Sequence, residues 1–154
     1  MTQDEIKKIL HYNPDTGIFT RIKSGKIIGT INKGGYCVAS IDYKQYKLHR
    51  LAFLYVYGYM PKLIDHINGI PHDNRISNLR EVTRCQNAMN RKIHTNNKTG
   101  IKGVYWNKSC KKWLAQIQIG NFRKYLGLFD DLELAELVAN EARLKYYGKF
   151  NRET

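Results

Sequence analysis

The stretch IDHINGIPHDNRISNL, residues 64–79, places an acid beside an imidazole, Asp65 and His66, at the entrance of a polar loop. Its asparagines and its glycine are ordinary turn formers, and a turn does not need an acid next to a histidine. Loops carry catalytic and binding residues more often than they carry packing. The flanking apolar residues predict two short strands around the loop, followed by a helix from about Arg84 to Lys92. We therefore expect chemistry in this β–loop–β–helix unit.

The composition predicts a globular chain with a polyanionic partner. The chain has 154 residues, of which 42% are hydrophobic, a formal net charge of +13 and a pI of about 9.7. Such a charge favours nucleic acid or an acidic membrane face as the partner. The longest apolar run, residues 51–60, is shorter than the roughly 20 residues that cross a bilayer. Nucleic acid is therefore the expected partner, and no membrane is expected.

The first residues and the cysteines indicate a cytoplasmic protein. Asp4 and Glu5 lie in the first ten residues, which contain no apolar block and so do not resemble a secretory signal. Cys37, Cys85 and Cys110 are odd in number and far apart. This pattern indicates reduced thiols and argues against a four-cysteine zinc site.

Two modules joined by a polar linker are expected. Residues 1–93 contain a short helix at 3–11, a β-rich stretch and a buried helix near 49–57, followed by the loop unit. The linker is predicted at residues 94–99, because this segment is polar and is followed by glycine. Residues 100–154 predict three short strands and then a helix from about 131 to 147. Its expected N-terminal box is Asp130 with Glu133, and its expected packed face consists of Leu134, Val138, Ala142 and Lys145.

The segments YKLHRLAF, IDHINGIPHDNRISNLREVT and QNAMN resemble an HNH endonuclease, in spacing as well as in residue type. The likeness is to the DHxxG…NN…NL…N form that is common in phage homing endonucleases. It implies an α+β fold containing a ββα-metal nuclease module that cuts DNA. If a phage encodes the chain, its place of action is the cytoplasm of the bacterial host.

The resemblance implies a role for each matching residue. His66 corresponds to the general base that takes a proton from the attacking water. Asp65 and Asn87 correspond to ligands of one divalent ion per nuclease unit, usually Mg²⁺. Asn78 corresponds to the middle asparagine, which holds the loop and orients the histidine. The last position is often histidine in the wider family, so this chain is an H-N-N variant.

Physical chemistry agrees with these roles. A carboxylate and an amide oxygen are hard ligands suited to Mg²⁺, and a neutral imidazole is a competent base near pH 7. The cleavage rate should therefore fall as the pH drops through about 6. Arg84 and Arg91 flank Asn87 on the expected helix and should meet DNA phosphates. Cys85 and Met89 are expected in the core.

Each of these residues also has a plain structural explanation when taken singly. Asparagine and glycine build turns, and His66 could be an ordinary half-buried histidine. The complete set at this spacing favours the functional interpretation. His49 matches the HRL sequence of the family, and it either approaches the same phosphate as a further catalytic residue or anchors the helix that it begins.

The segment from Gly100 to Asn151 resembles an AP2 DNA-binding domain in the motifs KGVYWNK, KWLAQIQI, KYLGLFD and YYGKFN. The resemblance implies a three-stranded antiparallel sheet backed by one helix, with the sheet in the major groove. The expected DNA-facing residues are Lys102, Tyr105, Asn107, Gln116, Gln118, Arg123 and Tyr125. The residues alone predict a packed and a polar face in this sheet, since Ala115 and Ile117 alternate with Gln116 and Gln118.

The charge of this segment supports a DNA-binding interpretation. Seven basic residues and no acid occur from Lys98 to Lys124, which predicts a wholly positive face. Glutamine can bond adenine edges and arginine guanine edges, while lysine mainly meets phosphate. The alternative is a solvated basic face that binds nothing in particular. Trp106 and Trp113 are expected to pack rather than to stack on bases.

Together these observations predict a site-directed, metal-dependent endonuclease that hydrolyses phosphodiester bonds of double-stranded DNA. The family resemblance implies products with 5′-phosphate and 3′-hydroxyl ends. One nuclease unit per chain predicts strand nicking by a monomer, whereas a homodimer could break both strands. The rival hypothesis is a DNA-binding regulator with an inactive nuclease unit. An RNA-binding module is a third possibility, which nothing in the sequence favours.

Overall fold

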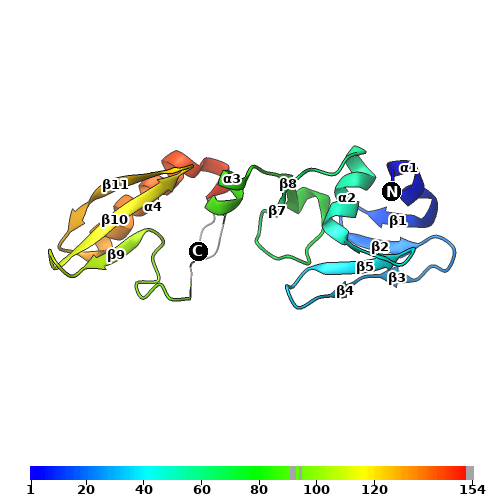
Figure 1. Ribbon diagram of the computed structural model, residues 1–154, viewed down its shortest axis with the longest axis horizontal. Coiled ribbons are helices and arrows are strands. Elements are labelled where there is room, and N and C mark those ends of the chain that lie inside the picture. Colours follow the sequence, from blue (N-terminus) through cyan, green and yellow to red (C-terminus); the bar gives the residue numbers. More distant parts are fainter. Residues whose placement is uncertain (91–92, 94, 152–154) are drawn as a thin grey trace. The chain divides into compact units, whose positions relative to one another are not determined.

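The computed structural model describes residues 1–90, 93 and 95–151, and divides into two compact units, Met1–Thr83 and Arg84–Thr154 (Figure 1). Each unit combines small antiparallel sheets with one or more helices, which agrees with the predicted mixture of α and β structure. The boundary between the units lies before the predicted end of the nuclease module at residue 93. The predicted limits of the modules and of the linker stay predictions.

The N-terminal unit begins with α1, Gln3–Ile9, which Thr2 and Glu5 close with a capping box. This helix is shorter than the predicted 3–11, because Leu10 has extended backbone and is buried as the first residue of a strand. Two three-stranded antiparallel sheets follow. The first contains β1 Leu10–Asn13, β2 Ile18–Arg21 and β3 Ile27–Ile28, and the second contains β4 Thr30–Ile31, β5 Cys37–Ile41 and β6 Lys44–Lys47.

Helix α2, Leu48–Tyr57, forms the centre of the N-terminal core. It contacts α1, β5 and β6, and its residues from Leu48 to Leu54 are buried except for Arg50. Nearly all sides of this helix are apolar, as predicted for residues near 49–57. The helix ends at Gly58, which has a φ of 80°.

The predicted strand–loop–strand is present at the end of this unit. β7, Ile64–His66, pairs with β8, Leu79–Glu81, in antiparallel register. The loop between them ends in a short 3₁₀ turn, η1, Ile76–Asn78. Leu79 is buried in the main core, so the second strand holds the loop against α2 and the two sheets.

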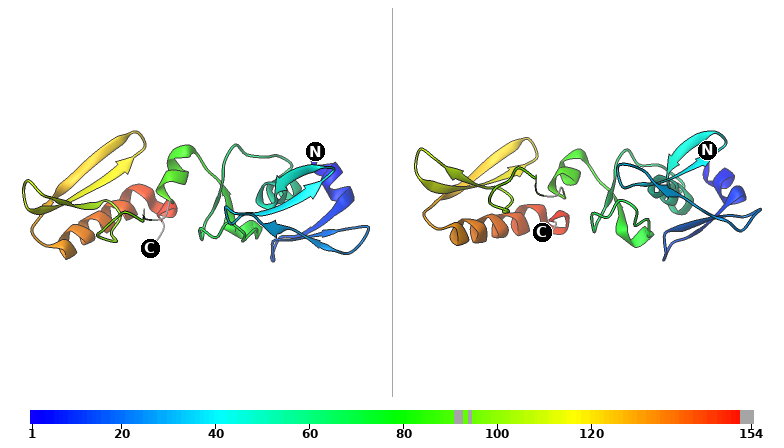
Figure 2. Two further views of the ribbon diagram at one scale, coloured as in Figure 1. Left: turned by 60° about the horizontal axis from the view of Figure 1, so that its bottom comes forward. Right: turned by 90° about the horizontal axis from the view of Figure 1, so that it is seen from below.

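The C-terminal unit contains a three-stranded antiparallel sheet and a long helix, in the predicted order. Figures 1 and 2 show α4 lying along one face of the sheet. Its elements are α3 Arg84–Met89, β9 Val104–Asn107, β10 Lys112–Ile119, β11 Phe122–Phe129, α4 Leu132–Tyr147 and η2 Gly148–Phe150. β10 lies in the middle of the sheet, and α4 contacts all three strands.

Two details of α4 differ from the prediction. The N-cap is Asp131, whose side chain accepts a hydrogen bond from the backbone N–H of Glu133, whereas Asp130 pairs with Lys112. The packed face consists of Ala135, Ala139, Ala142, Arg143 and Tyr147, and Leu134 is half exposed. The small alanines allow the helix to lie close to the sheet, which leucines on that face would prevent.

Helix α3 also differs from the prediction. It contains no buried residue, and Cys85, expected in the core, is exposed. Met89 does pack against the cluster formed by Ile117, Ala142 and Tyr147. Among the described residues, the helices are all too short or too polar to cross a bilayer.

Candidate functional site

Asp65 and His66 are the last two residues of β7, and both side chains are buried, at 8% and 6% exposure. In the β7–β8 pair Asp65 lies opposite Arg80 and His66 lies opposite Leu79. The backbone turns at once after His66, since its carbonyl accepts a hydrogen bond from Gly69 at 2.8 Å. A charged acid and an imidazole are thus enclosed at the point where the strand becomes the loop.

The rings of Tyr36 and His49 pack with the ring of His66 and form one layer. The imidazoles of His49 and His66 lie edge to face with centroids 5.0 Å apart, and the Tyr36 ring lies 5.4 Å from His49 and 6.1 Å from His66. The Lys47 ammonium sits over the outer ring of this layer, 4.0 Å from the centroid of Tyr36. His49 comes from α2 and Tyr36 from the turn before β5, so separate elements hold the layer.

Burial keeps both histidines neutral. It lowers the pKa of His66 below its ordinary value, and it lowers the pKa of His49 to about 3, with a smaller contribution from His66. A neutral imidazole can accept a proton. His49 is 5% exposed, and its Nδ1 has no hydrogen-bond partner among the described residues. This burial favours the anchoring explanation of His49 over direct contact with a phosphate.

Asn74 is the asparagine that acts on the His66 ring. Its side chain raises the pKa of His66 and opposes the effect of burial, although Oδ1 of Asn74 has no hydrogen-bond partner of good geometry among the described residues. Asn74 is 3% exposed, and its backbone carbonyl accepts a hydrogen bond from the Tyr12 hydroxyl at 2.7 Å. Gly17 permits this close approach, because a Cβ there would lie 2.6 Å from the backbone N of Arg75. Sequence reasoning noticed Asn74 only as a turn former.

Asn78 bridges two parts of the loop instead. Its Oδ1 accepts a hydrogen bond from the backbone N–H of Asn68 at 3.0 Å, and its Nδ2 donates to the carbonyl of Asp73 at 2.9 Å. Both partners lie in the loop between β7 and β8, so Asn78 links the beginning of the loop to its end. The Asp73 carboxylate also accepts hydrogen bonds from the side chains of Arg75 and Asn68.

Arg80 forms an ion pair with the carboxylate of Asp65. Its Nε and Nη2 both donate to Oδ2 of Asp65, at 3.0 and 2.8 Å. No local sequence pattern predicts this pair, and the strand register places the two residues directly opposite each other. A metal ion held by Asp65 must share this carboxylate with Arg80. The described residues contain no group of three or more His, Cys, Asp or Glu side chains arranged to hold a metal.

The other residues expected at this site belong to the C-terminal unit. Asn87 is half buried in α3, and Arg84 is the exposed first residue of that helix. Arg91 lies outside the described residues. The structure describes each unit by itself, so the pairing of Asn87 with Asp65 on one ion stays a prediction.

The sheet of the C-terminal unit presents one open face. Ala115 and Ile117 are buried against α4, so the alternating residues Gln116 and Gln118 lie on the opposite face. An irregularity after Ala115 pairs Gln116 with Tyr125, and Gln118 pairs with Arg123. Tyr105 lies opposite Leu114 on the same face. The predicted DNA-facing side chains of the three strands are therefore neighbours.

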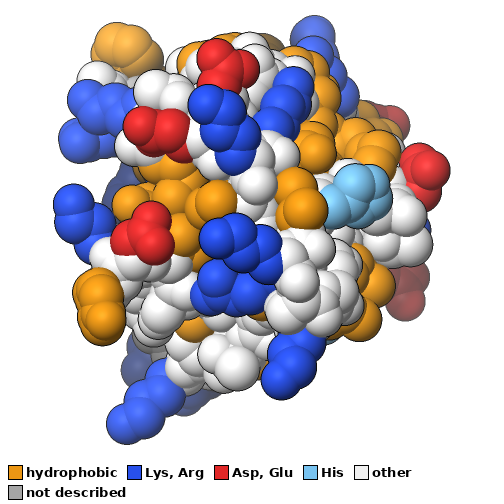
Figure 3. All heavy atoms as spheres, turned by 90° about the vertical axis from the view of Figure 1, so that its right-hand side faces the viewer, with side chains coloured by type: hydrophobic (Ala, Val, Ile, Leu, Met, Phe, Trp, Pro, Cys, Tyr) orange, Lys and Arg blue, Asp and Glu red, His pale blue; other side chains and the backbone are white. Residues whose placement is uncertain are grey.

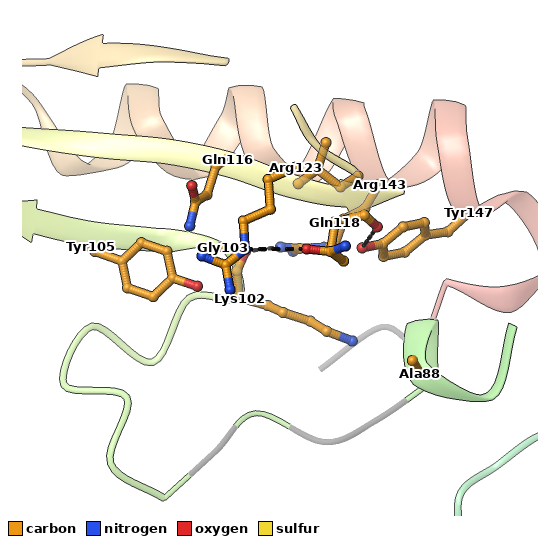
Figure 4. Close-up of a pocket in the computed structure, with 10 residues that line it drawn as sticks. Ala88, Lys102, Gly103, Tyr105, Gln116, Gln118, Arg123, Arg143 and Tyr147 are labelled. Carbon is orange, nitrogen blue, oxygen red and sulfur yellow. Dashed lines mark hydrogen bonds between the residues drawn. The ribbon is translucent and has the colours of Figure 1, made fainter. Parts of the chain in front are cut away.

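Five of these predicted residues line one pocket of about 500 Å³ (Figure 4). They are Lys102, Tyr105, Gln116, Gln118 and Arg123. The pocket also contains Arg143 of α4, a buried guanidinium that the sequence did not reveal. Arg143 donates to the carbonyl of Lys102 and to Oδ1 of Asn140, and burial lowers its pKa. Arg143 thus fixes the chain just before β9.

The prediction of a wholly positive face is wrong. The Lys124 ammonium reaches the hydroxyl of Tyr146 on α4, on the other side of the sheet, and Lys112 pairs with Asp130. Lys102 donates to the carbonyl of Met89 at 2.6 Å, at the end of α3. Asn107 accepts hydrogen bonds from the backbone of the following turn. Trp106 and Trp113 pack edge to face, as expected.

The loop unit agrees with a known family of nucleases. A family model described as HNH endonuclease matches residues 46–89, which include His49, the Asp65–His66 pair, Asn78 and Asn87. The chain therefore contains an HNH endonuclease domain. An uncharacterized HNH endonuclease of Acanthamoeba polyphaga mimivirus is 38% identical over 81 residues, which cover 47% of this chain and 20% of the viral protein.

A second relative covers more of the chain. Protein 3.8 of Escherichia phage T7 is 31% identical over 118 residues, which cover 71% of this chain and 92% of the phage protein. The chain belongs to the same family as this phage protein. No solved structure matches the chain.

Proposed function

We propose that the chain is a metal-dependent endonuclease that hydrolyses one strand of duplex DNA. His66 takes a proton from the water that attacks the phosphorus atom, the bond to the 3′ oxygen breaks, and that oxygen takes up a proton from solvent water to become the 3′-hydroxyl. A DNA partner follows from the HNH endonuclease family to which residues 46–89 are similar. The homing-endonuclease type of action is part of the same proposal.

The observation that carries the proposal is the buried, neutral imidazole of His66 beside the Asp65 carboxylate. Burial lowers the pKa of His66, so the ring is in the neutral form that a general base needs near pH 7. The ring layer with His49 and Tyr36, and the contact with Asn74, hold its orientation. The hydrogen bonds of Asn78 support the proposed role of that residue in holding the loop.

The donor set fits a hard divalent cation that keeps most of its waters. Mg²⁺ is often bound by one or two carboxylates together with substrate phosphate, and Asp65 supplies a carboxylate at the site. Asp65 would hold the ion, with Asn87 as its second protein ligand. When bound, the ion would stabilise negative charge on the reacting phosphate. Arg80 keeps the buried Asp65 carboxylate paired when no cation is bound.

The C-terminal unit is proposed to supply position and affinity on the DNA. The open face of its sheet brings Tyr105, Gln116, Gln118, Arg123 and Tyr125 together. These side chains combine base-edge hydrogen bonding with aromatic surface. Residues 84–154 contain 14 Lys and Arg against six Asp and Glu, compared with 12 against seven in residues 1–83. The AP2-like mode of binding through this sheet is part of the proposal.

One observation favours a different class of function. The ion pair between Asp65 and Arg80 would suit a DNA-binding regulator whose nuclease unit no longer binds a metal. In that protein the arginine would neutralise the carboxylate permanently. The two functions differ in whether a divalent cation enables strand cleavage.

Incubation of supercoiled plasmid and fragmented phage genomic DNA with the full chain, in Mg²⁺ or in EDTA, tests the proposal. We expect open-circular plasmid or new fragment ends only with Mg²⁺, with 5′-phosphate and 3′-hydroxyl ends. Linear plasmid as the first product would indicate a dimer that cuts both strands. Retention of duplex DNA in a gel without cleavage of either substrate would contradict the nuclease proposal and support the regulator.

A further inference from the structure

The hairpin between β5 and β6 has an unusual turn. Ile41 pairs with Lys44, so the turn consists of the two residues Asp42 and Tyr43, and both have positive φ, 47° and 61°. This is the arrangement of a type I′ turn, in which Asn-Gly is the preferred sequence. Aspartate tolerates left-handed backbone, whereas a bulky tyrosine adopts it at a cost in stability.

A second two-residue connection in the chain avoids this cost by placing glycine in left-handed backbone. The β10–β11 hairpin also has a two-residue connection, since Ile119 pairs with Phe122, and it places Gly120 at a φ of 59°. Among the described residues, Asp42, Tyr43 and Lys111 are the non-glycine residues with positive φ. Tyr43 is the aromatic one, and a strained residue that persists without a packing reason is a candidate for function.

No packing explains Tyr43. Its exposure is 108% of the reference value, higher than that of the other exposed hydrophobic residues of the chain that the structure describes. Its neighbours in the chain are one acid, Asp42, and one base, Lys44, and Arg21 donates to the carbonyl of Ser40 farther along β5. Figure 3 looks onto the N-terminal unit and shows Lys and Arg side chains spread among hydrophobic ones, with fewer Asp and Glu.

We propose that Tyr43 is a stacking wedge that inserts its ring at a base step of the duplex DNA. This inference rests on the proposed function, because it takes DNA as the substrate. A phenol ring offers the apolar face with which architectural proteins part a base step, and base–aromatic stacking is tolerant of sequence. At 108% exposure the ring is open to solvent, so it is accessible to a base.

The position of the hairpin suits this role. β6 runs from Lys44 to Lys47 and leads directly into α2, whose second residue is His49. At about 3.3 Å per residue the strand spans roughly 13 Å. DNA rises about 3.4 Å per base step on each strand, so the wedge lies within one helical turn of a phosphate at His66. A base step opened there would bend or hold the duplex near the cut.

The test is to replace Tyr43 with glycine in the full chain. Tyr43→Gly relieves the strained backbone, so we expect a higher melting temperature than that of the native protein. We also expect about tenfold weaker binding of a fluorescent 40-base-pair duplex of mixed sequence in EDTA, as the loss of one stacked base implies. Tyr43→Phe should bind as the native protein does, because stacking does not need the hydroxyl group.

Salt dependence and a matched control separate stacking from charge. The slope of log affinity against log salt should be the same for Tyr43→Gly and the native protein, since no phosphate contact is removed. Lys111→Gly relieves a similarly strained turn in the C-terminal unit. Because this variant also loses a positive charge, any loss of its affinity for the duplex should be accompanied by a shallower slope of log affinity against log salt. An equal loss at unchanged slope for Lys111→Gly would overturn the wedge, because turn relief alone would then explain the effect.

Other outcomes would also overturn it. Tyr43→Gly binding the duplex as tightly as the native protein excludes the wedge. If the native chain cuts DNA and the variant binds and cuts equally well, the wedge alone fails. If the native chain neither binds the duplex in EDTA nor cuts DNA, the proposed function fails with it.

Discussion

The imidazole of His49 lies edge to face against that of His66, with ring centroids 5.0 Å apart. Both rings are buried, and they come from elements that are distant in sequence, α2 and β7. The contact links the first helix of the HNH domain to the proposed base. The contact restricts rotation of the His66 ring.

The first prediction concerns His49. If its role is to pack against His66, His49→Phe should retain most of the cleavage rate, because an aromatic ring of similar shape remains. His49→Ala should lower the stability by about 3 kcal/mol, as for other buried rings, and lower the rate as well. Urea unfolding and single-turnover cleavage measure the two effects. Loss of cleavage in a stable His49→Phe protein would show that an imidazole nitrogen is required.

The second prediction concerns the pKa of His66. The Asn74 side chain raises this pKa, so Asn74→Ala should lower it further below the ordinary value. The base works in its neutral form, and the cleavage rate falls as the pH drops through the pKa of His66. The fall should therefore occur at lower pH in Asn74→Ala than in the native protein. An NMR titration of His66 measures the shift directly, and an unchanged or raised pKa would contradict the proposed contact.

A third prediction follows from the hydrogen bonds of Asn78. Asn78→Ala leaves the N–H of Asn68 and the carbonyl of Asp73 without this partner, which should cost about 2–4 kcal/mol of stability. Asn78→Asp retains the acceptor for Asn68 but buries a charge and sets an oxygen against the carbonyl of Asp73, so its loss should be at least as large. Urea unfolding and the hydrogen exchange of the Asn68 amide measure both changes. Unchanged protection of that amide in Asn78→Ala would rule out the bridge.

The fourth prediction is a dependence of stability on pH through Asp73. Hydrogen bonds from Arg75 lower the pKa of this carboxyl to about 2. A pKa that is lower in the folded than in the unfolded state stabilises above the unfolded pKa of about 3.9, and this stability disappears as the pH falls through about 2. Asp73→Asn should therefore melt below the native protein at pH 7, and the difference should shrink between pH 4 and 2.

A matched control is Asp15→Asn, at an exposed position in the Asn13 turn. Its melting temperature relative to the native protein should change little over the same pH range. If Asp73→Asn shows the same difference from the native protein at pH 7 and at pH 2, charge on Asp73 does not stabilise the loop.

Much of the fold could be predicted from local sequence patterns. The alternation around Ala115 and Ile117 predicted a middle strand with one packed face, and the apolar run near 49–57 predicted a buried helix. Both follow from the periods of two and 3.6 residues that govern burial in strands and helices. The place of Asp65 and His66 at the end of a strand could also be predicted, because apolar residues precede them and a polar loop follows them.

The parts that could not be predicted depend on contacts between elements. Arg80 reaches Asp65 because of the β7–β8 register, and Asn74 reaches His66 because Tyr12 holds its backbone. The cap of α4 is Asp131 rather than the neighbouring Asp130, and local sequence offers two equivalent acids there. The left-handed backbone of Tyr43 has no sequence signal at all, because tyrosine is an unusual choice for that turn.

Single-turnover cleavage in Mg²⁺ measures whether His66 acts as the base of a DNA-cutting site. The native chain, His66→Ala and His72→Ala are compared on the same duplex, with His72 as an exposed loop histidine for control. We expect a loss of about 10²- to 10⁴-fold in rate for His66→Ala, with DNA binding retained and with His72→Ala cutting as the native protein does. A His66→Ala protein that binds and cuts DNA at the native rate would contradict this role of His66.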